Sequence, residues 1–246
     1  INGINIGNFR CDAGKTFTIA NSHETIISLY NGRSYQNNGT IAGSGTGYLI
    51  LWLYDASPDF IPGNITCPFH VKLHEAAVAS RTLNLLSDAN FVNKLSIYSS
   101  HATFTCTVNL NGHSLTASTI TVGTRGILKC GNGTITTSSL DSSAGTIIPE
   151  TAQWIFDGAG TVKTNGTDKF HDLVIREDAF ITLGSNITIE NEFMNAGEIA
   201  MGAYAITHET PSEYYTVPMI YPIVRSVKRS PFFKGRFARN FERGGM

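Results

Sequence analysis

Charged residues and long apolar runs are both scarce in this chain. Only 15% of the 246 residues are charged and 41% are hydrophobic, a balance that excludes an intrinsically disordered chain. The longest apolar run, residues 48–54 (YLILWLY), is much shorter than the ~20 residues of a membrane-spanning helix, so we interpret it as a buried strand. No secretory signal stands at the N-terminus, which leaves open whether one has been removed.

Turn-forming residues, in contrast, are frequent. Between residues 104 and 206, short bursts of alternating Ile, Val, Leu, Phe and Thr are separated by Gly, Asn, Asp or Ser. Alternation with a period of two predicts strands, and the separating residues predict turns. No helical periodicity longer than two turns occurs in this region.

Short strands at even spacing fit a solenoid or a sandwich. Internal similarity favours the solenoid, because residues 38–43 (NGTIAG) recur in altered form as residues 196–201 (AGEIAM). Units of such a short period bury their apolar faces only by stacking on their neighbours. We therefore predict an all-β fold, a right-handed parallel β-helix. A β-sandwich is the alternative, because Asn111-Gly and Asn132-Gly suit hairpin turns.

The regularity of the pattern divides the chain into three parts. Residues 101–208 form the predicted solenoid, and residues 1–100 form a less regular β region that caps it. Within this first part, residues 73–86 contain the one stretch compatible with a helix, although its end is equally compatible with another coil. Residues 209–246 lose the alternation, and we predict an extended basic arm.

Several segments of the middle part resemble a known type of protein. They are LNGHSLTASTITVGTRGILKCGNGTITTSSL, WIFDGAGTV, KFHDLVI and ITLGSNITIENEFMNAGEI. They resemble the repetitive right-handed β-helix surface proteins of virions and of bacterial and archaeal cell envelopes, in which a unit of strands, Gly and Asn-Gly precedes an F-x-x-L-x-I strand. The resemblance implies a fold rather than one function, since such proteins serve as adhesins, tailspikes, coat components and carbohydrate lyases.

The four cysteines, Cys11, Cys67, Cys106 and Cys130, are widely spaced. They form no CxxC pair and no cluster with histidine, which argues against a zinc site. Each lies in an apolar or alternating stretch, as a buried thiol does, while disulfides remain an alternative outside the cell. The spacing of Cys106 and Cys130 is close to one turn of a three-stranded coil, which would stack them in adjacent turns.

Signatures of catalysis are missing. A polysaccharide-cleaving β-helix needs convergent acids, whereas Glu177-Asp178 and Glu190/Glu192 fall in turns or on outward faces. His70 and His74 are four residues apart but lack an intervening Glu and a third ligand, and even spacing places both on one face of a strand. We expect no enzymatic activity, no cofactor and no metal.

Five Asn-x-Ser/Thr sequons fit surface turns of a glycosylated extracellular protein. A composition rich in Asn, Gly and Thr also produces such sequons by chance. The candidate asparagines are Asn38, Asn64, Asn132, Asn165 and Asn186.

Basic residues are concentrated at the C-terminus. Residues 217–246 hold seven bases against one acid, so this segment carries +6 and the rest of the chain −7, for a net charge of −1. Nucleic acid, a membrane surface and an acidic subunit are all physically admissible partners. The prolines of the arm suit an extended segment in a protein groove, so we expect docking onto other subunits rather than nucleic acid. The predicted contact residues are Arg225, Lys228, Arg229, Phe232, Phe233, Lys234, Arg236, Phe237, Arg239, Phe241 and Arg243.

Together these features predict a non-enzymatic structural or attachment protein, extracellular or on a virion surface. Our first expectation is a homo-oligomeric virion tail, fibre or head-decoration component that is anchored by its arm, with a host or surface glycan as a further partner. A secreted adhesin or surface-layer protein is the second. A carbohydrate-active β-helix enzyme is the third.

Overall fold

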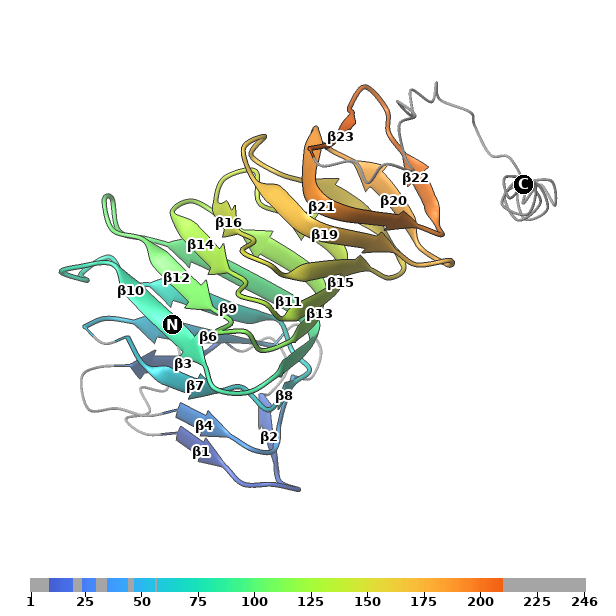
Figure 1. The fold of residues 1–246 in the computed structure, drawn as a ribbon. Helices are drawn as coiled ribbons and strands as arrows, with labels where there is room; N and C mark the ends of the chain where they lie inside the picture. Colours follow the sequence, from blue (N-terminus) through green and yellow to red (C-terminus); the bar gives the residue numbers. More distant parts are fainter. Residues whose placement is uncertain (1–8, 20–23, 30–34, 44–46, 56, 210–246) are drawn as a thin grey trace, which may run out of the picture.

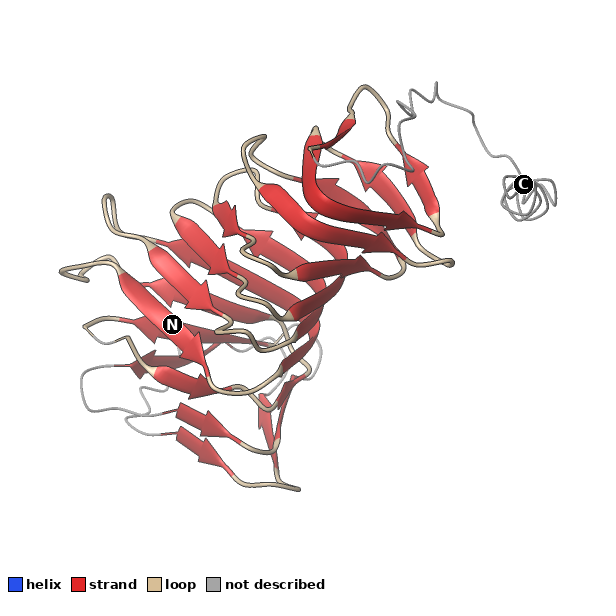
Figure 2. Cartoon of the chain, in the orientation of Figure 1, coloured by secondary structure: helices blue, strands red, loops and turns tan. Residues whose placement is uncertain are grey.

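The chain folds as a parallel β-solenoid of about nine turns (Figure 1). The computed structural model describes residues 9–19, 24–29, 35–43, 47–55 and 57–209. Within these ranges the protein contains strands and loops and no helix (Figure 2). All strand pairings between the described residues are parallel, which confirms the predicted solenoid and excludes the antiparallel sandwich. Since the described part contains no helix, it contains none that could span a membrane.

Three ladders of stacked strands form the sides of the solenoid. The first contains β1 (Phe9–Cys11), β4 (Tyr35–Asn37), β7 (Asp59–Ile61), β10 (Arg81–Leu85), β12 (Cys106–Asn109), β14 (Gly126–Lys129) and β16 (Thr146–Ile148). The second contains β2 (Thr16–Ile19), β5 (Thr40–Gly43), β8 (Asn64–Ile65), β11 (Ala89–Ser99), β13 (Leu115–Val122), β15 (Thr134–Asp141), β17 (Gln153–Phe156), β19 (Lys169–Ile175), β21 (Ile187–Asn195) and β23 (Ile206–His208).

The third ladder begins with β3 (Glu24–Leu29), β6 (Tyr48–Leu53) and β9 (Phe69–Leu73). It continues through the second halves of β11, β13 and β15, which run across the corner between two sides. It ends with β18 (Ala159–Lys163), β20 (Phe180–Leu183) and β22 (Glu198–Ala200).

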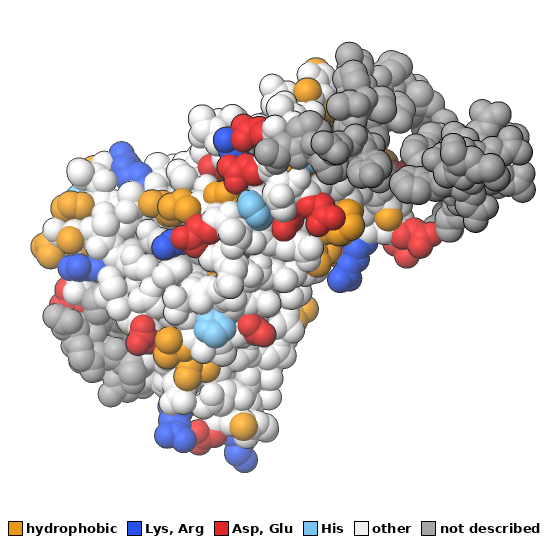
Figure 3. Space-filling view, viewed as in Figure 1, with side chains coloured by type: hydrophobic (Ala, Val, Ile, Leu, Met, Phe, Trp, Pro, Cys, Tyr) orange, Lys and Arg blue, Asp and Glu red, His pale blue; other side chains and the backbone are white. Residues whose placement is uncertain are grey.

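Alternate residues of each strand point into one continuous core. In β13, for example, Leu115, Ala117, Ile120 and Val122 are at most 1% exposed. Such strands alternate inward apolar and outward polar side chains, which is the pattern that the sequence shows. In the first turns the core is aromatic, and the ring of Tyr35 stacks between those of Phe9 and Phe60, at centroid distances of 5.0 and 4.4 Å. Figure 3 shows few charged side chains over the first ladder.

The turns of the solenoid shorten along the chain. Asn109 donates a hydrogen bond to Asn84, its register partner in the preceding turn, which is 25 residues earlier. Near the C-terminal end, Arg176 pairs with Asp157, only 19 residues earlier. In the first ladder the change occurs between β12 and β14, where Asn109 lies beside Lys129. The connection that leads into this ladder is also shorter there: it runs from Leu73 to Arg81 before β10 but only from Val122 to Gly126 before β14.

The ladders run through the first hundred residues without a break. β11, which ends at residue 99, pairs with β9 on one side and with β13 on the other. The segment 73–86 contains a turn and then β10, so of its two predicted structures the coil is confirmed and the helix is wrong. The predicted arm lies outside the described residues after Glu209.

The cysteines behave as buried apolar residues, as predicted. All four are buried and free. Burial raises the pKa of the Cys67 thiol to about 11 and that of the Cys106 thiol to about 12. The expected stacking of Cys106 on Cys130 is wrong. The register pairs Cys106 with Gly126 at the start of β14, whereas Cys130 follows the end of that strand. The turn at this point is shorter than the spacing between these two cysteines.

Candidate ligand-binding face

Strand β6 places aromatic side chains on the outside of the solenoid. Leu49, Leu51 and Leu53 point inward and are fully buried, whereas Tyr48 and Trp52 lie on the opposite face of the strand and are partly exposed. The inner face of the run 48–54 is therefore fully buried, and on the outer face Ile50 is buried between the partly exposed Tyr48 and Trp52. The alternation of this run is hidden in the sequence because the outward positions are aromatic or apolar instead of polar.

The strand register extends this face over the next turns. Ile50, His70, Ser96 and Thr121 form one row across β6, β9, β11 and β13. Two residues further along each strand, Trp52, Lys72 and Tyr98 form a second row. Side chains separated by about one turn in the sequence thus become neighbours on one surface.

The aromatic side chains of the face contact one another and one cation. The Nζ atom of Lys72 lies 5.4 Å from the ring centroid of Trp52 and 5.6 Å from that of Tyr98, within cation–π range of both. Beyond the strand ends, the rings of Tyr54 and His74 stack at a centroid distance of 3.9 Å. The indole Nε1 of Trp52 is buried and finds no hydrogen-bond partner among the described residues.

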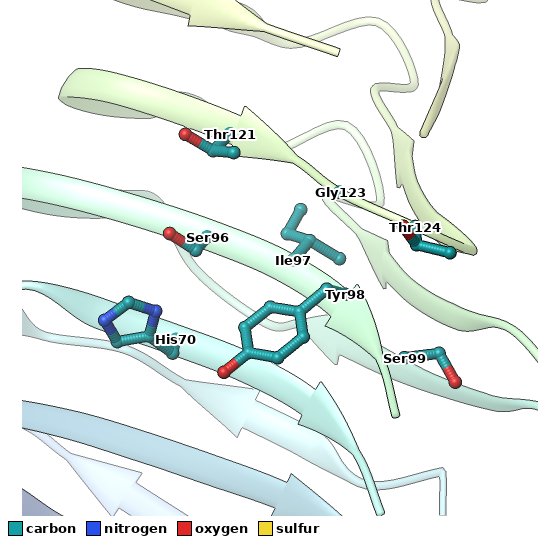
Figure 4. Close-up of a pocket in the computed structure, with 8 residues that line it drawn as sticks. All are labelled: His70, Ser96, Ile97, Tyr98, Ser99, Thr121, Gly123 and Thr124. Carbon is teal, nitrogen blue, oxygen red and sulfur yellow. The ribbon is translucent and has the colours of Figure 1, made fainter. Parts of the chain in front are cut away.

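An open depression of about 440 Å³ adjoins these rows (Figure 4). Figure 4 shows His70, Ser96 and Thr121 on successive strands, with the Tyr98 ring beside them. A side chain at Gly123 would meet the Cβ of Tyr98, so the glycine keeps this part of the depression open. The complete lining is His70, Ser96, Ile97, Tyr98, Ser99, Thr121, Gly123 and Thr124.

His70 is neutral at physiological pH. Burial, and secondarily the charge of Lys94, lowers the pKa of its imidazole to about 4. A neutral imidazole offers one N–H donor and one acceptor, and each hydroxyl of Ser96 and Thr121 offers both. The depression therefore presents an aromatic face beside groups that hydrogen-bond neutral hydroxyls.

The structure places the two spaced histidines on or directly after a strand and the candidate acids in turns or on the surface. His70 lies on the outward side of β9 and His74 follows its end, so the strand interpretation of their spacing is confirmed. Glu177 and Asp178 lie in an exposed turn. Glu190 lies 3.6 Å from Lys169 as a surface ion pair. Among the described residues, no group of three or more His, Cys, Asp or Glu is placed to hold a metal ion.

One carboxylate that the sequence did not single out is buried. Asp168 accepts hydrogen bonds from Ser142 Oγ at 2.7 Å, from the backbone N–H of Ile147 at 3.0 Å and from Asn165 Nδ2 at 3.0 Å. Burial raises the pKa of Asp168 despite these bonds. The bonds from Ser142 and Ile147 reach across to the preceding turn, so this group stabilises a corner of the solenoid.

The sequons occupy different environments. Asn38 and Asn132 are exposed in turns. Asn64 lies in β8 and is half-buried, with its Oδ1 buried and unpaired among the described residues. Asn186 accepts a hydrogen bond from Ala205 N at 2.9 Å, and Asn165 Nδ2 donates to Gly145 O at 2.7 Å. The predicted contact residues of the arm, from Arg225 to Arg243, lie outside the described residues.

The chain was compared with known proteins. No protein-family model, curated protein or solved structure matches it. What it shares with β-helix surface proteins is the parallel solenoid.

Proposed function

We propose that the protein is a non-enzymatic attachment protein of an extracellular or virion assembly, and that the face formed by β6, β9 and β11 binds its ligand. The aromatic composition of this face carries the proposal. Later in the same ladder the outward positions are Ser139, Thr161 and Thr182, as expected of a solvent-exposed strand. In the earlier turns the outward positions gather Tyr48, Trp52 and Tyr98 instead.

The ligand class that fits this face is a glycan. A sugar ring has an apolar C–H face, which would stack on the Tyr98 ring, and a rim of hydroxyls. Neutral His70 and the hydroxyls of Ser96 and Thr121 would hydrogen-bond that rim, because each both donates and accepts. Aromatic walls with a few convergent polar groups are the usual composition of a small-molecule site.

The solenoid body would serve as a rigid shaft, since its core is continuous from the first turn to the last. The arm would attach the shaft to another subunit with an acidic surface, because residues 217–246 combine a charge of +6 with four phenylalanines. A virion tail, fibre or head-decoration component is our first placement and a cell-surface adhesin or surface-layer protein the second. A signal peptide upstream in the full gene would decide for the second.

A glycan array tests the ligand. The full chain and the Tyr98→Ala variant are applied to a panel of neutral and acidic oligosaccharides, with Tyr204→Ala as the control because Tyr204 is exposed in a loop far along the stack. We expect binding that is lost in Tyr98→Ala and kept in Tyr204→Ala. Absence of binding to the whole panel would refute the glycan.

Deletion of residues 225–246 tests the arm. The truncated body should keep its β-rich circular dichroism spectrum and its glycan binding but no longer join its assembly. Normal assembly of the truncated protein would refute the anchoring role.

A further inference from the structure

The last turn of the solenoid exposes a cross-section of the core. Phe193, Ile199 and Ile206 are only partly buried. Their register partners one turn earlier, Leu173, Ile181 and Ile187, are at most 2% exposed. The same inward positions are therefore buried in the penultimate turn and partly exposed to solvent in the last one.

The backbone of this turn is also open on one side. Within the described residues, the second half of β21 pairs only with β19, β22 only with β20 and β23 only with β21. The backbone N–H and C=O groups of such an edge can hydrogen-bond to a further strand, and natural proteins cover or block such edges. The last described link to this surface is the hydrogen bond from Glu209 N to Ile189 O at 2.8 Å.

The charge of this end argues against the same end of a second copy as its cover. Residues 169–209 contain seven acids and two bases, and Figure 3 shows acidic side chains gathered over this part of the stack. Glu192 and Glu198 are exposed and form no ion pair with a described lysine or arginine. Two such ends brought together would repel each other.

We infer that residues 210–224 of the same chain dock onto this open end and cap the solenoid. The segment follows Glu209 directly, so it is held beside the surface at a high effective concentration. The inference is independent of glycan binding, and it leaves the basic residues 225–246 for the proposed attachment.

The composition of the segment suits a cap. Its sequence, TPSEYYTVPMIYPIV, contains three tyrosines and five aliphatic or methionine side chains but only one charged residue. These side chains would cover Phe193, Ile199 and Ile206 and remove their apolar surface from water. Pro211, Pro218 and Pro222 lack a backbone N–H, so the outer edge of the cap would not recruit another strand.

Amide hydrogen exchange on the full chain tests the inference. The amides of β22 and β23 should exchange on the order of tenfold more slowly in the wild type than in a Tyr215→Asp/Ile220→Asp variant. Phe233→Asp/Phe237→Asp is the matched control, because it places the same two charges in the arm but outside the capping segment. Exchange in β13 reports in the same experiment whether each variant remains folded.

Three outcomes would overturn the inference. One is equal exchange of β22 and β23 in the wild type and in the Tyr215→Asp/Ile220→Asp variant. Another is an equal effect of Phe233→Asp/Phe237→Asp, which would assign the cover to the basic part of the arm. The third is protection that appears only when the protein concentration is raised, which would assign it to a second copy.

Discussion

The Nζ atom of Lys72 lies 5.6 Å from the ring centroid of Tyr98, its register partner on the next strand. On the other side, the ring of Trp52 lies 5.4 Å from the same nitrogen. Three successive turns thus place an aromatic ring, a cation and a second aromatic ring in one row on the outside of the solenoid. These contacts hold Tyr98 beside the depression, and the first prediction concerns this residue.

Replacement of Tyr98 by alanine should weaken glycan binding about tenfold, or about 1.4 kcal/mol, because the stacking surface is lost. Isothermal titration calorimetry measures the change in Kd. Tyr204→Ala should leave the Kd unchanged. Equal Kd values for the wild type and Tyr98→Ala would show that the ligand does not stack on this ring.

His70 should make the fold sensitive to acid. Its pKa is lowered to about 4 in the folded chain, mainly by burial, against ~6.5 in the unfolded chain. The unfolded chain therefore binds more protons between these values, and the free energy of unfolding decreases as the pH falls from 6.5 towards 4. In His70→Gln the loss between pH 7 and pH 4.5 should be smaller by roughly 1–2 kcal/mol, measured by urea unfolding. An NMR titration of His70 with an inflection near pH 6.5 would contradict this explanation.

A charge inside the core should unfold the body. Ile120 is fully buried in β13 and Ile187 is 2% exposed in β21. We expect Ile120→Asp and Ile187→Asp each to lower the free energy of unfolding by about 4 kcal/mol or more, because the carboxylate finds no partner there. Thermal unfolding followed by circular dichroism measures the loss. Thr116→Asp, at an exposed position of the same strand β13, should change stability little, and full tolerance of the two core substitutions would refute their inward orientation.

Asp168 should contribute to stability through its hydrogen bonds. Asp168→Ala leaves the backbone N–H of Ile147 buried without its partner, and we expect a loss of about 2–4 kcal/mol in the free energy of unfolding. Asp59→Ala, at an exposed position of β7, should cost less than about 0.5 kcal/mol in the same urea titration. Similar losses for the two variants would show that the corner does not depend on Asp168.

The sequence predicted the solenoid best where inward apolar residues alternate with outward polar residues along a strand. Strand β13 has this pattern in each half: Leu115 and Ala117 are buried in the first half, and Ile120 and Val122 in the second. The first hundred residues are built in the same way, but their turns are longer and their outward positions include apolar residues. In β6, Ile50 lies on the outward face and is nevertheless only 5% exposed, so no polar residue marks the period.

The candidate binding face was harder to predict because its members are distant in the sequence. Trp52, Lys72 and Tyr98 become neighbours only through the register of three strands. The register steps between them are unequal, 20 residues from Trp52 to Lys72 and 26 from Lys72 to Tyr98, so no single repeat length in the sequence brings them together. The sequence did place His70 on one face of a strand, but the burial that lowers its pKa depends on neighbours from other turns.

The turns shorten from 25 residues at Asn84 and Asn109 to 19 at Asp157 and Arg176, and the first ladder ends at β16. A solenoid of constant cross-section can continue from one molecule into the next, strand on strand, and such a head-to-tail contact repeats without closing. Here β1, β2 and β3 offer strands of all three ladders at one end, whereas β22 and β23 offer strands of only the third and second ladders at the other. This mismatch opposes the strand-on-strand growth of one molecule on the next into a filament.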